Sequence, residues 1–443
     1  MKNVGLQITK TVFLLFLFMV LLQSPVSAQP GKVTEEVLPN GLKILLKEEH
    51  KTPIVTFQIW YKVGSRNERL GTTGLSHMLE HMMFKGTKKY GAKQFSRIVQ
   101  RNGGNDNAFT SQDYTAYFEN IAANRIKLAL ELESDRMKNL LLNNKEFLSE
   151  RDVVKEERRM RYEDDPIRTL HEQMLAAAFN AHPYQWPVIG WMADIGNFTR
   201  DDLVRHYRTY YVPNNATIIV VGDFHTPAML HLIEQYFGKI PRGLPVPVMG
   251  AVEPIQQGER RVIMKKKAEL AAVFIGYKTP TLKHPDSPAL DVLQCVLSEG
   301  KSSRLYRSLV YEKQIALYAG GDYDSISADP NLFTLYAGVM PGKTSDEIEK
   351  ALYEEMNRFK TTLVSSKELQ KAKNQIEASF LMGQDSVFHQ GMLLGQFESV
   401  ASWKLLETYL DRIRSVTPED VMRVAKAYFT NDNRTVGILV PTN

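Results

Sequence analysis

The chain has 443 residues, a formal net charge of +5 and one cysteine, Cys295. A charge this small does not indicate a nucleic-acid-binding protein. A single cysteine excludes an intramolecular disulfide, so stability has to come from a hydrophobic core. A chain of this length provides such a core and is expected to form two or more domains.

The first 28 residues have the pattern of a secretory signal peptide. Lys2 and Lys10 precede an uninterrupted apolar run over residues 12–22, which is too short to span a bilayer. Val26 and Ala28 suit a signal peptidase, so cleavage is predicted after Ala28. The mature protein is then exported, periplasmic or secreted, with no stable membrane anchor. The alternative is an uncleaved anchor.

The next predicted elements are a strand over residues 54–62 and a helix over residues 74–84. Three ionisable side chains, His77, Glu80 and His81, share one stripe of this helix with Phe84. The opposite side is apolar: Met78, Leu79, Met82 and Met83. Both sides are therefore expected to be buried. A buried His/Glu/His cluster without a partner would cost several kcal/mol.

The three ionisable residues have the spacing His-x-x-Glu-His, which supplies two zinc ligands one turn apart and a general base. A divalent cation accepts both imidazoles and leaves the Glu80 carboxylate free to handle a proton. The alternative is a pair of core histidines satisfied by backbone carbonyls, with Glu80 in a salt bridge.

A strand is predicted from Ala108 to Tyr117, because this run is rich in Thr, Tyr and Phe, and the glycines at 103 and 104 give it a flexible entry. A helix is predicted over residues 147–161.

This second helix offers acids for a third zinc ligand, which a catalytic zinc ion usually requires. Its apolar stripe is expected to centre on Val153 and Val154, in line with Glu150 and Glu157. Glu157 is the candidate ligand, and Glu150 would orient a ligand histidine or share a proton with the site. The alternative is that both acids lie on the helix surface.

The pattern of residues 198–221 recurs 218 positions later. In each copy a threonine, Thr199 or Thr417, and two acids open an amphipathic helix, an asparagine marks a turn, and a β-rich run follows. Strand-like runs over residues 54–62 and 273–278 match at the start of each half. An internal duplication explains these similarities.

The predicted zinc-site helix has a counterpart that lacks its chemistry. An offset of 214 residues places His77, Glu80 and His81 on Asp291, Gln294 and Cys295, respectively. One half is therefore expected to be catalytic and the other structural. Residues 241–260 are rich in turn formers and are predicted to link a zinc-binding catalytic domain, residues 33–240, to a homologous non-catalytic domain, residues 261–443.

These motifs resemble the pitrilysin/insulinase group of zinc peptidases, which includes mitochondrial processing peptidase. The resemblance covers nearly the whole mature chain and depends on residues 77–81, on residues 151–157 with Asp165-Pro166, and on the 76-residue separation of His81 and Glu157. It implies that His77, His81 and Glu157 bind one Zn²⁺, that Glu80 activates the water, and that Glu150 assists catalysis from behind the ligands. It also implies an α+β fold in which two homologous α/β domains form half of a clamshell.

Residues 105–110, with Asp113, Thr115 and Tyr117, resemble the substrate-binding edge strand of this group. An extended peptide would add to that edge through main-chain hydrogen bonds, and the resemblance assigns substrate contacts to Asn107 and Ala108. The alternative is an ordinary hairpin.

The second half departs from the pattern of the group, which has an Arg and a Tyr seven residues apart that bind the substrate and stabilise the oxyanion. Residues 302–305 align, but the Arg position falls on Val310 or Tyr311, and the nearest downstream tyrosine is Tyr318. Losing an oxyanion donor costs about 2.7–4 kcal/mol. A dimer is therefore predicted, either with a related subunit that supplies the Arg/Tyr pair or between two copies in which Tyr311 or Tyr318 suffices.

Three functions are compatible with these features. The first is a zinc metalloendopeptidase that hydrolyses peptides or unfolded polypeptide segments in an enclosed chamber. The second is a non-catalytic structural or peptide-binding subunit of a related heterodimer. The third is zinc chemistry on a non-peptide substrate.

Overall fold

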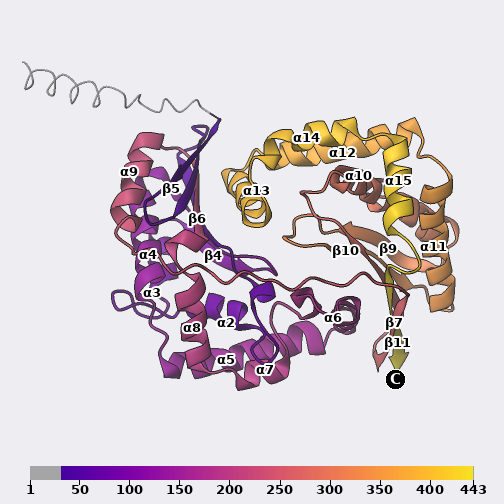
Figure 1. Cartoon of the computed structure of the whole chain (residues 1–443), viewed down its shortest axis with the longest axis horizontal. Helices are drawn as coiled ribbons and strands as arrows, with labels where there is room; N and C mark the ends of the chain where they lie inside the picture. The colour runs from indigo at the N-terminus through magenta and orange to yellow at the C-terminus, as the bar shows by residue number, and fades with distance from the viewer. Residues whose placement is uncertain (1–30, 443) are drawn as a thin grey trace, which may run out of the picture.

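The computed structural model describes residues 31–442, which form two lobes that each contain one β-sheet (Figure 1). The predicted signal peptide lies outside the described residues. None of the helices within residues 31–442 has the length and apolar character needed to cross a bilayer.

The sheet of the first lobe has six strands in the order β1-β2-β6-β3-β5-β4. Its strands are β1 (Val33–Val37), β2 (Lys43–Glu48), β3 (Ile54–Tyr61), β4 (Asn105–Thr110), β5 (Thr115–Ala122) and β6 (Ala216–Gly222). Strands β3 and β6 are buried along almost their whole length, because side chains cover both faces of the sheet. β4 lies at one edge.

The sheet of the second lobe has five strands in the order β7-β11-β8-β10-β9, which repeats the first sheet from β2 to β4 without a counterpart of β1. Its strands are β7 (Arg260–Lys267), β8 (Ala272–Thr279), β9 (Ala316–Tyr323), β10 (Asn331–Val339) and β11 (Arg434–Thr442). In each sheet the last strand of the lobe runs parallel to one neighbour and antiparallel to the other. The two lobes therefore share one topology, and the predicted α+β fold of two homologous α/β domains is confirmed.

The repeated sequence pattern forms the same local structure in both lobes. Thr199 and Thr417 cap α8 (Arg200–Tyr210) and α15 (Pro418–Tyr428) through reciprocal hydrogen bonds with an aspartate at the third helical position. After each helix an asparagine side chain, from Asn215 or Asn433, donates to the carbonyl oxygen of the helix's last residue. Each helix thus enters the following strand through the same turn.

The remaining helices pack against the two sheets or against other helices. In the first lobe they are α2 (Leu75–Met82), α3 (Gln94–Arg101), α4 (Ile126–Asn139), α5 (Asn144–Arg158), α6 (Pro166–Ala178), α7 (Met192–Asn197) and α9 (Thr226–Phe237). In the second they are α10 (Ser287–Ser298), α11 (Ser345–Thr361), α12 (Ser366–Gly383), α13 (Val387–Val400) and α14 (Leu405–Ser415).

The lobes exchange one helix each. α6 of the first lobe buries Leu170 and Met174 against β8 and β11 of the second sheet, and α13 of the second lobe buries Leu394 and Phe397 against β3 and β6 of the first (Figure 1). The approach of α13 is very close, since a Cβ atom on Gly395 would lie 2.0 Å from the Trp60 ring. Each lobe therefore depends on the other to cover one face of its sheet.

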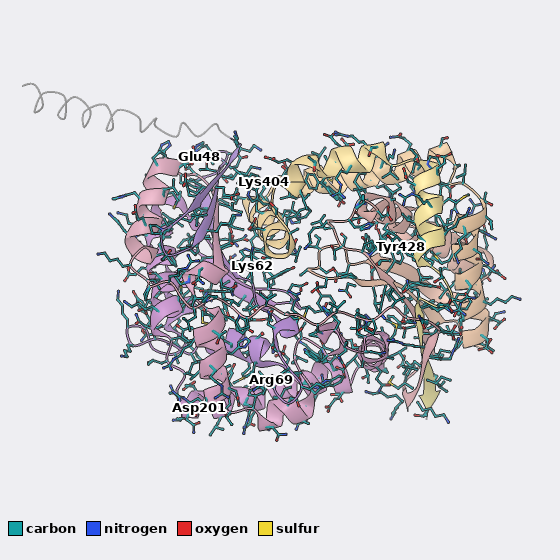
Figure 2. The ribbon with its side chains drawn as sticks, viewed as in Figure 1. Glu48, Lys62, Arg69, Asp201, Lys404 and Tyr428 are labelled. Carbon is teal, nitrogen blue, oxygen red and sulfur yellow. The ribbon has the colours of Figure 1, made fainter. Side chains whose placement is uncertain are left out.

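Polar contacts join the lobes beside α13. Lys62, labelled in Figure 2, lies 3.4 Å from the carboxylate of Glu398, which also accepts a hydrogen bond from Lys43 at 2.9 Å. Residues 241–259, which make up most of the predicted linker, contain no helix or strand. The domain boundaries stay a prediction.

Three details of the sequence prediction were wrong. Residues 108–117 form no single strand, because a turn around Ser111 separates β4 from β5 and makes them a hairpin. α5 ends at Arg158 and continues as one π-helical turn over Arg159–Glu163. Val153 of α5 is 49 % exposed, so Phe147 and Val154 carry the buried apolar stripe instead.

Candidate metal centre

Close packing and hydrogen bonds fix the first residues of helix α2, which carries His77, Glu80 and His81. Gly74 has a left-handed φ of 92°, and a Cβ atom there would lie 2.3 Å from the carbonyl oxygen of Ile189. The Glu68 carboxylate accepts the N–H groups of Gly74 at 2.6 Å and Ser76 at 2.7 Å, which satisfies donors at the free start of the helix. Met78, Leu79 and Met82 then bury the apolar side in the core.

The opposite side of α2 faces α5. Glu157 Oε2 lies 3.3 Å from His81 Nε2 and 3.7 Å from His77 Nε2. Ligand atoms of the three residues all lie within 4.8 Å of one another. The structure therefore brings together the three residues predicted as ligands, from two helices that are distant in the sequence.

The three donors fit a zinc ion. Zn–N and Zn–O bonds of about 2.0–2.1 Å in a tetrahedron place ligand atoms about 3.3–3.4 Å apart, close to the observed separations. Two histidines and one glutamate also form a known catalytic donor set that leaves one position open for water. His77 Nδ1 is buried and has no hydrogen-bond partner among the described residues, whereas its Nε2 faces the other donors.

The surroundings shift the pKa values of the two imidazoles in opposite directions. Burial, reinforced by the neighbouring His81, lowers the pKa of His77 to about 4. Burial also disfavours the charged ring of His81, but hydrogen bonds to Glu150 and Glu157 outweigh this effect and raise its pKa to about 9. Because a metal ion binds an imidazole nitrogen that carries no proton, metal binding at this site competes with protonation of His81.

Glu150 lies behind the ligands. One carboxylate oxygen is 2.9 Å from His81 Nδ1, and the other pairs with Lys85. This contact orients the His81 ring so that Nε2 faces the cluster. Glu157 is held in the same way by Arg161, whose guanidinium lies 3.0 Å from its second oxygen.

Glu80 lies beside the cluster and is not one of its donors. Thr110 Oγ1, on edge strand β4, donates a hydrogen bond to Glu80 Oε2 at 2.6 Å. Burial raises the pKa of Glu80, and the Thr110 hydroxyl acts in the opposite direction. A cavity of about 380 Å³ opens onto Glu80 and His81, which leaves room for water at this carboxylate.

Sequence reasoning missed three side chains that hold this arrangement: Thr110, Lys85 and Arg161. Arg161 follows Glu157 by four residues, so helical spacing indicated this pair. Lys85 lies beyond the end of α2 and pairs with Glu150 of α5, so helical spacing did not indicate its contact. Thr110 gave no such signal, because its contact with Glu80 depends on how β4 packs against α2.

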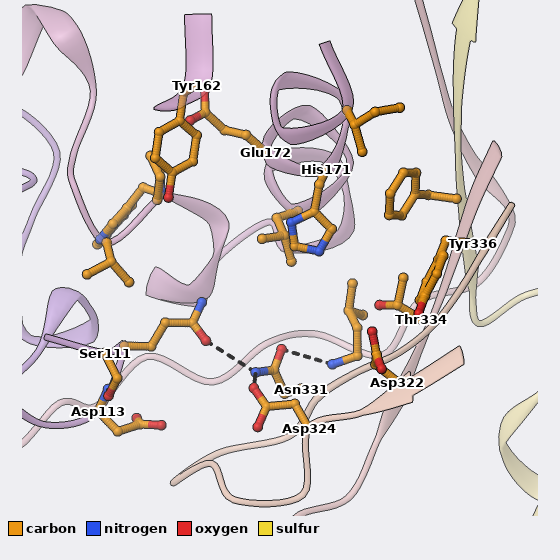
Figure 3. Close-up of a pocket in the computed structure, with 18 of the residues that line it drawn as sticks. Ser111, Asp113, Tyr162, His171, Glu172, Asp322, Asp324, Asn331, Thr334 and Tyr336 are labelled. Carbon is orange, nitrogen blue, oxygen red and sulfur yellow. Dashed lines mark hydrogen bonds between the residues drawn. The ribbon is translucent and has the colours of Figure 1, made fainter. Parts of the chain in front are cut away.

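A larger cavity of about 670 Å³ lies between the lobes (Figure 3). Its lining residues include Ser111, which is next to Thr110 in the sequence, and Tyr162, which is five residues beyond Glu157. Across the cavity, Asn331 of β10 donates to Gln112 at 3.2 Å and to Asp324 at 3.0 Å. The cavity therefore begins close to the candidate metal centre and extends towards the second lobe.

The predicted substrate residues lie on the edge of the first sheet. β4 pairs only with β5 within the described chain, so its other side is open. Asn107 is exposed, and its side-chain oxygen accepts the N–H of Ala108 at 2.9 Å. A peptide added at this edge would have to displace this local hydrogen bond.

The second lobe has the predicted counterpart of α2 without its donors. α10 carries Asp291, Gln294 and Cys295, and within residues 31–442 no candidate metal cluster includes a residue of this lobe. Tyr311, at the position expected for the Arg, is 73 % exposed, and Tyr318 lines the larger cavity.

Known proteins give the same fold and family. Residues 43–190 match the family described as insulinase (peptidase family M16), and residues 197–376 match the peptidase M16 inactive domain. The zinc protease PqqE of Helicobacter pylori is 36 % identical over 410 residues, which cover 91 % of this chain and 92 % of that protein.

Solved structures of other proteins have the same fold. A crystal structure of a protease from Helicobacter pylori is 35 % identical, with a TM-score of 0.90 over 93 % of this chain and 100 % of that one. The periplasmic protease PqqL from Escherichia coli shares the fold, with a TM-score of 0.76 at 18 % identity, and this chain corresponds to 48 % of its length. The predicted resemblance is confirmed, and the chain belongs to the insulinase family of peptidases, peptidase family M16.

Proposed function

We propose that this protein is a zinc-dependent metalloendopeptidase that cleaves peptides or unfolded polypeptide segments. The observation that carries the proposal is the meeting of His77, His81 and Glu157 at separations suited to zinc, with Glu80 beside them. The family of zinc proteases to which the chain belongs supports the same function.

Each side chain has a role in this reaction. When bound, zinc supplies Lewis acidity that polarises the scissile carbonyl and makes a water molecule more acidic. Glu80 accepts the proton of the attacking water at its carboxylate and delivers it to the leaving amine. Thr110 holds that carboxylate in place and favours its ionised form. Glu150 fixes the tautomer and orientation of His81.

The substrate is proposed to bind as an added strand on β4. The open edge of β4 ends at Thr110, which contacts Glu80, so a peptide paired along Asn107 and Ala108 would lead towards the base. Main-chain hydrogen bonds of this kind accept many sequences. The cavity that starts at Ser111 gives side chains of such a peptide space between the lobes.

We further propose that the active form is a dimer. Tyr311 is 73 % exposed, and the Val310 side chain has no hydrogen-bond donor to replace the missing Arg. A second chain, either another copy or a related subunit, would supply the oxyanion donors. The matching of this chain to about half of PqqL supports the pairing of two such units.

Metal removal and replacement tests the proposal. The purified protein, alone and mixed with any related subunit encoded nearby, is assayed on an unstructured fluorogenic polypeptide before chelation, after chelation and after zinc is returned. We expect activity to be lost on chelation and restored by zinc. Activity that survives complete metal removal would contradict the proposed chemistry.

Glu80→Gln is the matched control, because it removes the base and keeps the size of the side chain. It should bind zinc like the wild type and lose about 10²–10⁴-fold in kcat, the usual contribution of a general base. His81→Ala should lose activity together with the zinc held by His77, His81 and Glu157. A fully active Glu80→Gln protein would show that another group takes the proton.

The missing Arg supports a second candidate function, a non-catalytic peptide-binding subunit. In that case the protein would bind unfolded peptides and leave them uncut, even with zinc and a partner present. Peptide capture measured by fluorescence anisotropy, together with product analysis by mass spectrometry, separates the two functions.

A further inference from the structure

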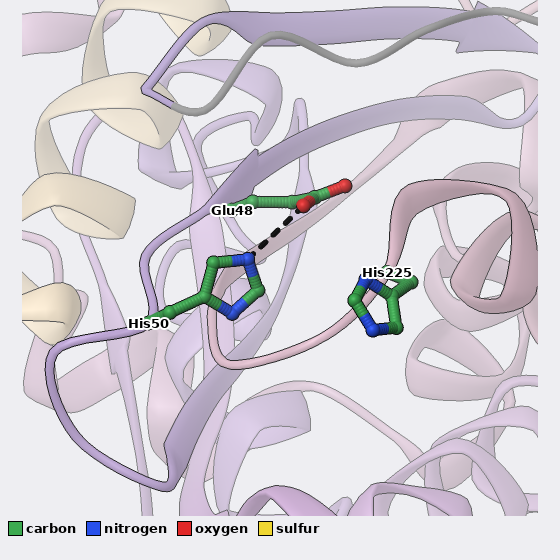
Figure 4. Close-up of side chains that lie close together, drawn as sticks. All are labelled: Glu48, His50 and His225. Carbon is green, nitrogen blue, oxygen red and sulfur yellow. Dashed lines mark hydrogen bonds and ion pairs between the residues drawn. The ribbon is translucent and has the colours of Figure 1, made fainter.

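A second cluster of metal-binding side chains lies in the first lobe, far from α2. It consists of Glu48 at the end of β2, His50 in the loop that follows, and His225 just before α9 (Figure 4). Their ligand atoms all lie within 4.8 Å of one another. Figure 2 shows Glu48 at the opposite end of the lobe from Arg69, which precedes α2, so the two clusters are separate sites.

The geometry around His50 reproduces that around His81. His50 Nδ1 lies 2.7 Å from the carboxylate of Asp223, as His81 Nδ1 lies 2.9 Å from Glu150. His50 Nε2 lies 3.1 Å from Glu48 Oε2, whereas His81 Nε2 lies 3.3 Å from Glu157 Oε2. In both sites one carboxylate orients the imidazole and a second faces its other nitrogen, the usual surroundings of a metal-bound histidine.

The other donors are also placed for a cation. Glu48 is held by the N–H of Thr226, at the start of α9, which donates to its Oε1 at 2.7 Å and leaves Oε2 for the cluster. The ring centroids of His50 and His225 are 5.8 Å apart. Both histidines are exposed, so a cation from solution reaches them directly. The carboxylates of Glu48 and Asp223 supply the charge that balances a divalent ion.

We propose that Glu48, His50 and His225 form a second zinc site, with Asp223 as the residue that positions His50. Two imidazoles and a carboxylate are the donors preferred by zinc and similar borderline divalent ions. The site would join the β2–β3 loop to the start of α9 and stabilise the lobe without taking part in hydrolysis. The competing occupant is a proton on His50 Nε2, which would make the same contacts a simple ion pair.

The number of zinc ions bound per chain distinguishes a zinc ion at this site from a proton on His50. Metal-free full-length protein is titrated with Zn²⁺ in competition with a chromophoric chelator. We expect two equivalents for the wild type, one for His225→Ala, one for His81→Ala and none for the double variant. His231→Ala removes another exposed histidine of α9 that lies outside the cluster, and should keep two equivalents.

Asp223→Asn provides a second, milder variant that keeps all three donors. It should weaken the second equivalent about 10–100-fold, because the residue acts only through His50. A wild-type protein that binds one equivalent, lost in His81→Ala and unchanged in both His225→Ala and Asp223→Asn, would overturn the second site and leave the proposed function intact. The reverse loss, only in His225→Ala, would overturn the centre on α2 instead.

Discussion

Replacing Thr110 with valine tests whether Glu80 acts as a base whose ionisation is tuned by its neighbour. The change removes the hydroxyl that donates to Glu80 Oε2 at 2.6 Å and keeps the branching of the side chain. A hydrogen bond to a charged group is worth about 1.5–3 kcal/mol, or roughly 10–150-fold in an equilibrium. Because the bond favours the ionised carboxylate, its loss raises the pKa of Glu80 further.

The measurement is the pH dependence of kcat/KM on a fluorogenic peptide. A base works in its ionised form, so the acidic limb of the Thr110→Val profile should move to higher pH, with a loss of about tenfold or more on that limb. Activity above the limb should change much less. Thr110→Ser keeps the hydroxyl and should retain the wild-type limb.

Two results would refute this reasoning. A Thr110→Val profile that superimposes on the wild type would show that the hydroxyl does not affect the base. A uniform loss at every pH, with the limb in place, would show that Thr110 acts only by holding β4 against α2.

Three further predictions concern the metal, the lobe contact and pH. Glu150→Gln should weaken zinc binding at α2 about 10–100-fold, measured by chelator competition, because it alters the group that orients a ligand ring. Gly395→Ala should lower the free energy of unfolding by about 1–3 kcal/mol, because the added methyl overlaps Trp60, whereas Gly250→Ala, in open space, should be neutral in the same urea titration. Burial lowers the pKa of His206 to about 3, so the unfolded chain alone takes up this proton below about pH 6.5. Stability should therefore fall by about 2 kcal/mol between pH 7.5 and pH 5, and His206→Asn should flatten that slope.

Periodicity and repetition predicted much of this fold. The paired threonine caps, the asparagine turns and the final strands of both lobes follow from local preferences that the sequence shows directly. The strand prediction over residues 108–117 was wrong because Thr, Tyr and Phe favour strands on both sides of a turn that contains no glycine. Val153 was misplaced because the buried apolar stripe of α5 is narrow: Phe147 and Val154 form it, and Val153 lies outside it.

The sequence predicted the proposed zinc ligands, but it did not predict all of the side chains around them. His77 and His81 lie four residues apart, and Glu157 follows the periodicity of its own helix. A single sequence is therefore enough to predict all three residues. The contact of Thr110 with Glu80 depends on tertiary packing and leaves no trace in spacing. The cluster around His50 was missed because its donors come from the end of a strand and two loops and form no sequence motif.

The exchange of α6 and α13 has a consequence for how the two halves hold together. Each helix is covalently connected to its own lobe and packs its apolar side against the sheet of the other lobe. Cutting the exposed segment near Leu244 would therefore yield a nicked molecule whose fragments stay associated under native conditions. A single lobe of this kind would leave one face of its sheet uncovered unless it exchanged the same helix with a second copy.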